Sequence, residues 1–347
     1  MDGSGPVQHL FQSFWYGGAL SPYELVCLKS FIDCGHAFDL YTYDPNLAVP
    51  AGVRVCDASE LFSRDEVFVY QAEGFGKGSP SAFSNLFRSK LMVEKGGWWA
   101  DTDVVCLTGR IPVVTEFFAR QDADFVAWGI MYFEPRHPVM VQCLDQGTKL
   151  GRTVKWGDSG PRLLTRVLTE RGLIDRAQPA SVCYPIHYTQ ALDVLRPSRT
   201  AAVAGLIETS LFLHLWNAML VFRGVQKTCL PPKGSLLRQW ADKHPVDGWV
   251  GEYDEQTLEH ALGLKAELNA LQAALQLKTT ENERLQAEAQ TPGNERSQAA
   301  LELQTVENQR LQAALNAMLT STSWRLTAPL RAGGRRFPAL RFLRGPR

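Results

Sequence analysis

The sequence lacks an excess of charge of either sign, since its 36 lysines and arginines equal its 36 aspartates and glutamates. A neutral chain has no overall positive field with which to hold nucleic acid, so a nucleic-acid-binding protein is not expected. The seven cysteines are scattered and include no Cys-x-x-Cys pair, which argues against a zinc site or a disulfide framework. We expect buried, reduced thiols and a cytoplasmic protein.

Long hydrophobic runs are missing as well. The most apolar stretch, residues 206–222, is interrupted by Glu208, His214 and Asn217, so it is too polar and too short to span a bilayer comfortably. The first nine residues have neither a basic segment nor an apolar one, and no secretory signal is expected. With 347 residues, the chain nevertheless has material for a large buried core.

Residues 1–254 have the pattern of an α/β domain. Short apolar or aromatic runs alternate there with segments of helical spacing. Ser21 and Pro22 are suited to the cap and first turn of a helix, and Pro161 to the first position of another. The spacing predicts strands at 10–16, 38–43 and 125–133, and helices at 21–34, 83–94, 139–150 and 162–171.

Residues 257–322 differ sharply in composition and are rich in Leu, Ala, Gln and Glu. Apolar residues recur at heptad spacing, and segments 281–287 and 307–313 are nearly identical. The spacing predicts coiled-coil helices broken at Pro292. They either fold back as a hairpin or associate with another chain, which would allow self-association; a solvated helix is the simpler alternative.

The last segment, 323–347, contains seven arginines and no acidic residue, interleaved with aromatic and aliphatic side chains. This composition fits peripheral adsorption to an anionic membrane surface, such as the inner face of the membrane. A partly disordered cationic tail is an equally good interpretation.

The richest stretch is residues 83–107, in which an amphipathic run stops at Gly96-Gly97 and an aromatic strand leads to Asp101-Thr102-Asp103. We expect the strand to end in these residues, so that Asp101 and Asp103 point to the same side, because side chains alternate along a strand. Two converging carboxylates are a good site for a hard divalent cation. A sugar-nucleotide diphosphate is the obvious anion to complete its shell.

This stretch also resembles a known family. Asn85-Leu86-Phe87-Arg88, then Gly96-Gly97-Trp98-Trp99 and Asp101-Thr102-Asp103, is similar to the signature of glycosyltransferase family 32, which is related to the large glucosylating toxins. The resemblance implies the GT-A fold, a nucleotide-sugar donor and retention at the anomeric carbon, and it does not cover the coiled coil or the tail. The family's helix aspartate is Asn85 here, which loses a charge but keeps a hydrogen-bonding side chain of the same shape.

The resemblance implies roles for the residues of this stretch. Asp103 would ligate Mn²⁺ or Mg²⁺, and Asp101 would contact the ribose and sugar and is a second candidate metal ligand. Arg88, with Ser84 and Asn85, would hold the donor sugar or a phosphate oxygen; a helix-surface ion pair is the alternative for Arg88. Trp99 shares the face of Asp101 and would cover the nucleotide, whereas Trp98 is expected in the core.

Two further segments are candidates for the donor site. Trp15, in Phe14-Trp15-Tyr16-Gly17-Gly18, would stack on the uracil, unless it is an ordinary strand aromatic. His214 would complete the metal site, since a neutral imidazole suits Mn²⁺, unless it is a satisfied core histidine. Trp216 would reach the diphosphate through its ring N–H.

The acceptor is expected near the loop Gly157-Asp158-Ser159-Gly160-Pro161, which resembles the family's Gly-Pro loop. Asp158 is the candidate for contacting an acceptor hydroxyl. The alternative is a plain helix N-cap made by Asp158 or Ser159.

We therefore predict a metal-dependent glycosyltransferase that moves a hexose from a nucleotide-diphosphate donor, with a UDP-sugar as the first candidate, to a glycan or lipid-linked acceptor in envelope, capsule or lipopolysaccharide-type synthesis. The main alternative is a binding or scaffold protein, in which the transferase domain is degenerate and the coiled coil is the functional part. A nucleotidyltransferase is disfavoured because no Gly-rich loop with a basic residue follows the first strand. A protein acceptor, as for the toxins, is also possible.

Overall fold

The structure is a computed structural model and describes residues 7–71, 76–289 and 295–321. The expected helix break at Pro292 and the basic tail at 323–347 lie outside the described residues. The described chain forms two compact units. One comprises residues up to 219 together with 227–252, and the other comprises residues 220–226 and the helical segment that begins at Tyr253.

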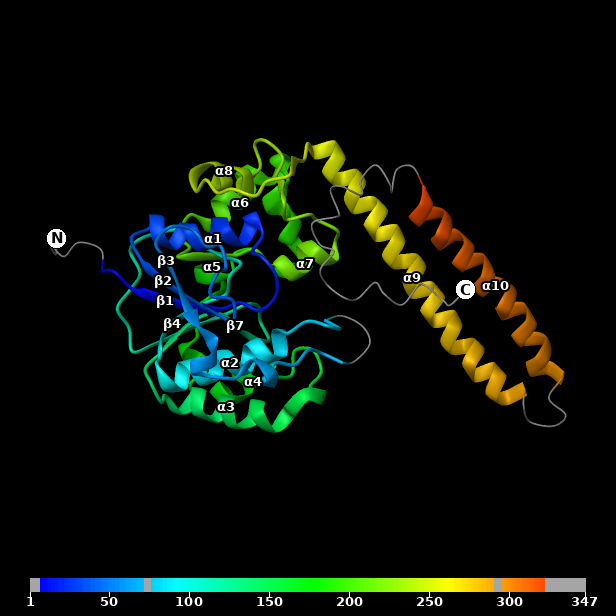
Figure 1. The fold of residues 1–347 in the computed structure, drawn as a ribbon, viewed down its shortest axis with the longest axis horizontal. Coiled ribbons are helices and arrows are strands. Elements are labelled where there is room, and N and C mark those ends of the chain that lie inside the picture. Colours follow the sequence, from blue (N-terminus) through cyan, green and yellow to red (C-terminus); the bar gives the residue numbers. More distant parts are fainter. Residues whose placement is uncertain (1–6, 72–75, 290–294, 322–347) are drawn as a thin grey trace. The chain divides into compact units, whose positions relative to one another are not determined.

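A mixed sheet forms the centre of the first unit (Figure 1). Its first four strands are parallel and the last two are antiparallel to their neighbours. The order along the sheet is β3 (Val53–Asp57), β2 (Ala37–Thr42), β1 (Leu10–Phe14), β4 (Gly97–Ala100), β7 (Val126–Phe133) and β6 (Glu116–Arg120).

Helices cover both faces of this sheet (Figure 1). On one face, α1 (Pro22–Asp33) packs Leu28 and Phe31 against a core that includes Trp98. The opposite core includes Trp99 and is covered by α2 (Ser81–Glu94), α3 (Pro138–Leu150) and α4 (Pro161–Glu170). The adjacent tryptophans thus point to opposite faces, as expected for a strand.

The local signals at the start of α1 act as expected. Pro22 occupies the first helical turn, and the backbone N–H of Ser21 donates to Glu24 Oε2 at 3.0 Å. This is one half of a capping box, which satisfies a donor that the helix itself cannot. The first strand is shorter than predicted, because its pairing with β2 ends at Phe14 and Tyr41.

Outside the main sheet, the chain forms two small sheets. In one, β5 (Val104–Cys106) pairs antiparallel with β8 (Phe212–His214). In the other, β9 (Cys229–Leu230) pairs parallel with β10 (Gly251–Glu252). The helices here are α5 (Ala180–Cys183), α6 (Thr200–Ile207), α7 (Asn217–Phe222) and α8 (Leu236–Lys243).

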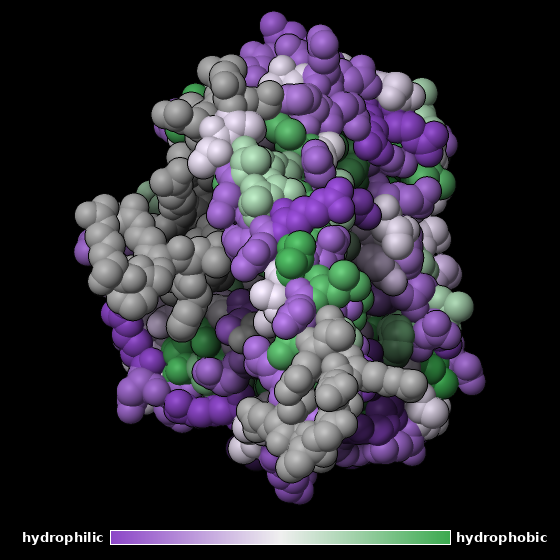
Figure 2. All heavy atoms as spheres, turned by 90° about the vertical axis from the view of Figure 1, so that its right-hand side faces the viewer, coloured by the Kyte–Doolittle hydropathy of each residue, from purple (hydrophilic) through white to green (hydrophobic). Residues whose placement is uncertain are grey.

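The second unit contains two long helices, α9 (Glu255–Ala289) and α10 (Glu295–Thr320), which lie side by side in Figure 1. Leu268, Leu315 and Met318 form the buried core between them. On the face drawn in Figure 2, hydrophobic residues are interspersed with hydrophilic ones among the coloured atoms. Within the described part of the chain, no helix has both the length and the hydropathy of a membrane span.

Candidate functional site

The two aspartates lie in a turn where the chain leaves the main sheet. The last pairing of β4 joins Ala100 to Ile130, and the backbone N–H of Asp101 donates to Gly129 at 2.8 Å. Val104 N then donates to the carbonyl of Asp101 at 3.2 Å, which closes the turn. The expectation that the strand continues through residues 101–103 is therefore wrong, because the next strand, β5, belongs to another sheet. The turn, and not strand alternation, brings Asp103 back towards Asp101.

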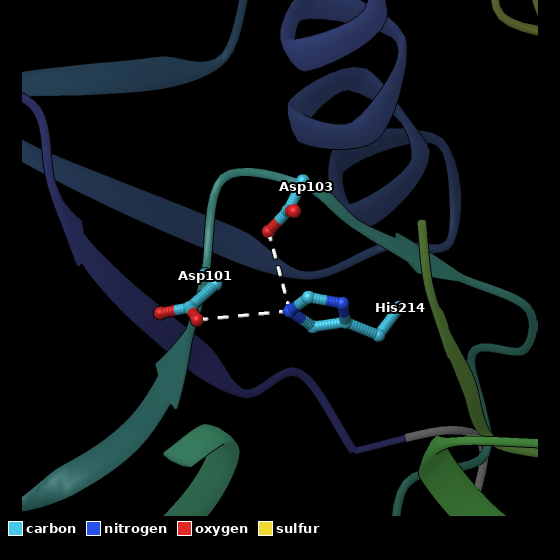
Figure 3. A group of neighbouring side chains, drawn as sticks. All are labelled: Asp101, Asp103 and His214. Atoms are coloured by element: carbon cyan, nitrogen blue, oxygen red, sulfur yellow. Dashed lines mark ion pairs between the residues drawn. The ribbon is translucent and has the colours of Figure 1, made fainter. Parts of the chain in front are cut away.

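His214 joins these carboxylates from the end of β8. That strand pairs with β5 so that His214 lies opposite Val104, next to the turn. Its Nε2 lies 3.4 Å from Asp103 Oδ1 and 3.7 Å from Asp101 Oδ2 (Figure 3). The three candidate ligand atoms all lie within 4.8 Å of one another. The structure thus brings together the three residues that were predicted as metal ligands.

The donor set fits a divalent cation. One oxygen of each carboxylate is held by the protein: Asp101 Oδ1 accepts from Arg88 and Trp99, and Asp103 Oδ2 accepts from the backbone N–H of Asn217. The other oxygen of each faces His214. Two carboxylate oxygens and one imidazole nitrogen suit Mn²⁺ better than Mg²⁺, which prefers oxygen ligands and an octahedral shell.

The second ring nitrogen of His214 determines where its proton lies. Trp216 donates its backbone N–H to His214 Nδ1 at 3.1 Å, so in this arrangement the ring proton is on Nε2, between the carboxylates. Burial opposes protonation of His214, but the negative charges of Asp103 and Asp101 outweigh it and raise the pKa of the imidazole. A cation that binds at Nε2 must therefore displace a proton. The neutral ring then carries its proton on Nδ1 and gives up the hydrogen bond from Trp216.

This competition gives a pH dependence. Because the pKa of His214 is raised, we expect the affinity for Mn²⁺ to increase as the pH rises through and above about 6.5, the ordinary histidine value. Titration of Mn²⁺ by its electron paramagnetic resonance signal between pH 5.5 and 8.5 measures this. The variant His214→Gln should bind more weakly with a flatter profile. An unchanged profile in the variant would contradict a role for His214 as ligand.

Arg88 is a buried cation that supports Asp101. Only 4% of Arg88 is exposed, and its guanidinium lies 2.6 Å from Asp101 Oδ1 and 4.6 Å from the centre of the Trp99 ring. Burial lowers the pKa of Arg88 despite the nearby Asp101. Burial by itself raises the pKa of Asp101, but Arg88 and His214 reverse this and lower it, which keeps the carboxylate ionised. The pair is internal, so the alternative of a surface ion pair for Arg88 is wrong.

Trp99 holds the same carboxylate from another side. Its Nε1 donates to Asp101 Oδ1 at 2.7 Å, and the side chain is 1% exposed within the core. A ring buried in this way cannot cover a nucleotide, so that expectation is corrected to a role in fixing Asp101. The alternation along β4 predicted its direction but not its depth.

Asn85 connects this pair to the loop that precedes α4. Its Oδ1 accepts from Arg88 at 3.2 Å, and its Nδ2 donates to Ser159 Oγ at 3.2 Å. Ser84 lies half-buried beside it on α2. Gly160 is the cap of α4, so the alternative of a side-chain N-cap by Asp158 or Ser159 is wrong.

The other two tryptophans predicted at the donor site, Trp15 and Trp216, use their ring N–H groups for hydrogen bonds within the protein. Trp15 Nε1 donates to Gly18 O, and Trp216 Nε1 donates to Ile186 O, both at 2.8 Å. The expected contact of Trp216 with a diphosphate through this N–H is therefore not available in this arrangement. The Trp216 ring instead packs on His214, with ring centres 4.3 Å apart. Trp15 is half-buried against the core on the α1 face.

Gly129 is a site residue that the sequence reading missed. A Cβ atom at this position would lie 2.7 Å from His214 Cδ2, 3.0 Å from its Nε2 and 3.1 Å from Tyr184 Oη. Glycine within a strand often marks a close approach of another group, and this was the only available signal. The His214 ring can lie where it does because Gly129 has no side chain.

Gly129→Ala should therefore displace His214. We expect Mn²⁺ to bind about tenfold more weakly and the free energy of unfolding to fall by about 1–3 kcal/mol from overpacking. Isothermal titration and chemical denaturation measure the two effects. Gly147→Ala is a suitable control, because its Cβ would meet only ordinary contacts at 3.8 and 3.9 Å inside α3. Equal Mn²⁺ affinities in both variants would contradict the inference that the cation site needs the space left by Gly129.

The fold and site describe an α/β protein with a candidate cation site of two aspartates and a histidine. Residues 132–245, which include Asp158 and His214, match a family model described as an alpha 1,4-glycosyltransferase conserved region. Residues 132–245 are therefore similar to glycosyltransferases.

Individual relatives agree with this class. The chain is 28% identical over 150 residues to human alpha-1,4-N-acetylglucosaminyltransferase, covering 39% of this chain and 42% of that protein. It is 23% identical over 179 residues to mouse lactosylceramide 4-alpha-galactosyltransferase, covering 48% and 50%. The chain spans half or less of the length of these curated relatives. A solved structure, the PaToxG glycosyltransferase, aligns with a TM-score of 0.37 at 14% identity over 48% of this chain and 70% of that one.

Proposed function

We propose that this protein is a metal-dependent glycosyltransferase of the GT-A type that transfers a hexose from a nucleoside diphosphate, UDP in the first instance, to a hydroxyl of a glycan or lipid-linked acceptor. The convergence of Asp101, Asp103 and His214 at one point carries the proposal. The similarity to an alpha-1,4-N-acetylglucosaminyltransferase and a 4-alpha-galactosyltransferase supports an α-linked product. With an α-linked nucleotide sugar as donor, such a product means retention of configuration.

Different residues are proposed to bind the cation, to position its ligands and to contact the donor. Asp101, Asp103 and His214 would hold the cation, which neutralises the charge that develops on a diphosphate leaving group. Arg88 and Trp99 fix Asp101 and keep it ionised. Ser84 and Asn85 line the adjacent helix, and Trp15 at the end of β1 is the candidate for the base. In a front-face displacement, the bond between the anomeric carbon and the diphosphate oxygen breaks while the acceptor oxygen bonds to the same face of that carbon. The proton of the acceptor hydroxyl passes to the departing diphosphate oxygen.

Asn85 is better explained by this network than by degeneration. A single amide can accept from Arg88 and donate to Ser159, whereas an ionised carboxylate can only accept. The departure from the family aspartate is therefore compatible with an active enzyme. It weakens the alternative in which the domain is a scaffold for its helices.

A thermal-shift screen of nucleotide sugars with and without Mn²⁺ tests the proposal, since a ligand of the native state raises its apparent stability. A UDP-sugar should stabilise the protein only with Mn²⁺, and the same sugar should be hydrolysed slowly without acceptor. If neither UDP nor any nucleotide sugar binds in isothermal titration, the scaffold alternative is favoured instead.

The loop before α4 is proposed as the acceptor side. Asp158 is partly exposed, is held by Arg162 at 3.1 Å, and is adjacent to Ser159, which contacts Asn85. Asp158→Asn should raise the KM for the acceptor about tenfold, as expected when the hydrogen bond from the acceptor hydroxyl loses its charged partner at a cost of about 1.4 kcal/mol. Donor hydrolysis should not change. Asp145→Asn, on the exposed face of α3, is the matched control; equal effects of both would remove Asp158 from the acceptor site.

We propose further that the protein acts in the cytoplasm at the inner face of a membrane, in envelope-type polysaccharide synthesis. The arginine-rich segment 323–347 supports contact with anionic lipid. The long helices α9 and α10 carry exposed apolar side chains at Leu277, Leu303 and Val306, which supports self-association as a coiled coil.

A further inference from the structure

Glu24 is a buried acid that the proposed function does not use. It lies on α1 and is 2% exposed. Its Oε2 accepts from the backbone N–H of Ser21, as a capping residue does, but its Oε1 accepts from Lys227 and from Asn217 Nδ2, the latter at 2.6 Å. A capping box needs neither burial nor a cation. The second carboxylate oxygen therefore requires another explanation.

Asn217 links Glu24 to the candidate metal site. Its backbone N–H donates to Asp103 Oδ2 at 2.9 Å, while its side-chain amide donates to Glu24. Asn217 is 6% exposed, so both bonds are shielded from water. With Oδ2 fixed in this way, Asp103 turns Oδ1 towards His214.

The backbone before Asn217 needs such an anchor. Trp216 has a φ of 57°, the left-handed region that is unfavourable for a residue with a bulky side chain. Such a conformation persists only where the surroundings enforce it. In the arrangement without a cation, this same residue supplies the N–H that His214 Nδ1 accepts. The firm link to the candidate ligands is therefore the bond from Asn217 N–H to Asp103.

We propose that Glu24, held by Lys227, is a positioning residue that acts through Asn217 to fix Asp103 for cation binding. The inference rests on the proposed function and adds a buried network from α1 and the segment after α7 to the site. Burying a lone carboxylate is costly, and the ammonium of Lys227 makes the placement of Glu24 possible. The hydrogen bond from the Asn217 side chain is therefore accepted by Glu24 Oε1, which Lys227 holds in place.

Two double variants separate positioning from simple charge pairing. Glu24→Gln with Lys227→Met and Glu24→Met with Lys227→Met are both neutral and both lose the carboxylate at Ser21. They differ in that only glutamine keeps an oxygen for Asn217. Mn²⁺ affinity is measured by paramagnetic resonance in the presence of UDP, and unfolding by thermal denaturation.

We expect the glutamine double variant to bind Mn²⁺ within about threefold of the natural protein. The methionine double variant should bind about tenfold more weakly at a similar unfolding temperature. Asn217→Leu, which leaves the Glu24 and Lys227 pair intact, should show the same loss as the methionine double variant. Equal Mn²⁺ affinities in the two double variants, or an unchanged affinity in Asn217→Leu, would overturn the inference. If the natural protein itself binds no Mn²⁺, the proposed function fails, and the inference with it.

Discussion

Asp103→Asn should lower turnover of the nucleotide sugar by about 10³-fold, the effect of losing about 4 kcal/mol of transition-state stabilisation. The carboxylate is the ligand candidate in the turn after β4, with one oxygen 3.4 Å from His214 Nε2. Asparagine keeps an oxygen that can accept from the backbone N–H of Asn217, so the fold should persist. Steady-state release of UDP at saturating Mn²⁺, with circular dichroism of the same sample, measures both.

The matched control is Asp145→Asn, which makes the same chemical change at an exposed ion pair with Lys149 on α3. It should alter neither turnover nor metal affinity, because exposed pairs contribute little. Mn²⁺-dependent turnover within tenfold of the natural protein in Asp103→Asn would exclude this aspartate as a ligand. A loss of turnover together with unfolding would instead assign it a structural role.

The elements built from local signals could be predicted from the sequence. Three features depend only on residues close together in the sequence and can therefore be predicted from it: the cap at Ser21, the proline in the first turn of α1 and the glycines after α2. The alternation of Trp98 and Trp99 onto opposite faces is equally local. These features were sufficient to predict an α/β domain and the order of its first helices and strands.

The geometry of the site was not available in the same way. Whether a strand continues past Ala100 depends on partners that are far away in the sequence. Here β4 pairs with β7, whereas the next strand, β5, pairs with β8 in another sheet. The same pairing delivers His214, and the empty position at Gly129 admits its ring. The burial of Trp99 and the bonds made by Trp216 Nε1 also follow from tertiary packing. The motif therefore predicted which residues gather, whereas their orientation required the structure.

Arg88→Met should lower the free energy of unfolding by about 3 kcal/mol, because it leaves the Asp101 side chain, only 25% exposed, without its cation. The guanidinium is almost fully buried, at 2.6 Å from Asp101 and against Trp99, so solvent cannot replace it. Asp101 should then take up a proton more easily and lose its value as a cation ligand, since Arg88 lowers its pKa. Urea denaturation and Mn²⁺ titration measure the two consequences.

A second substitution separates stability from function in this pair. Arg88→Met combined with Asp101→Asn removes both charges and should recover most of the lost stability, since burying an uncompensated charge is the main cost. Mn²⁺ affinity and turnover should remain low, because the second carboxylate ligand is missing. Arg166→Met, in the exposed pair with Glu170, serves as the control and should change stability by less than about 1 kcal/mol. If the double variant regained turnover, Asp101 would not be a ligand of the cation. If Arg88→Met were as stable as the control, the ion pair of Arg88 and Asp101 would not contribute to the stability of the fold.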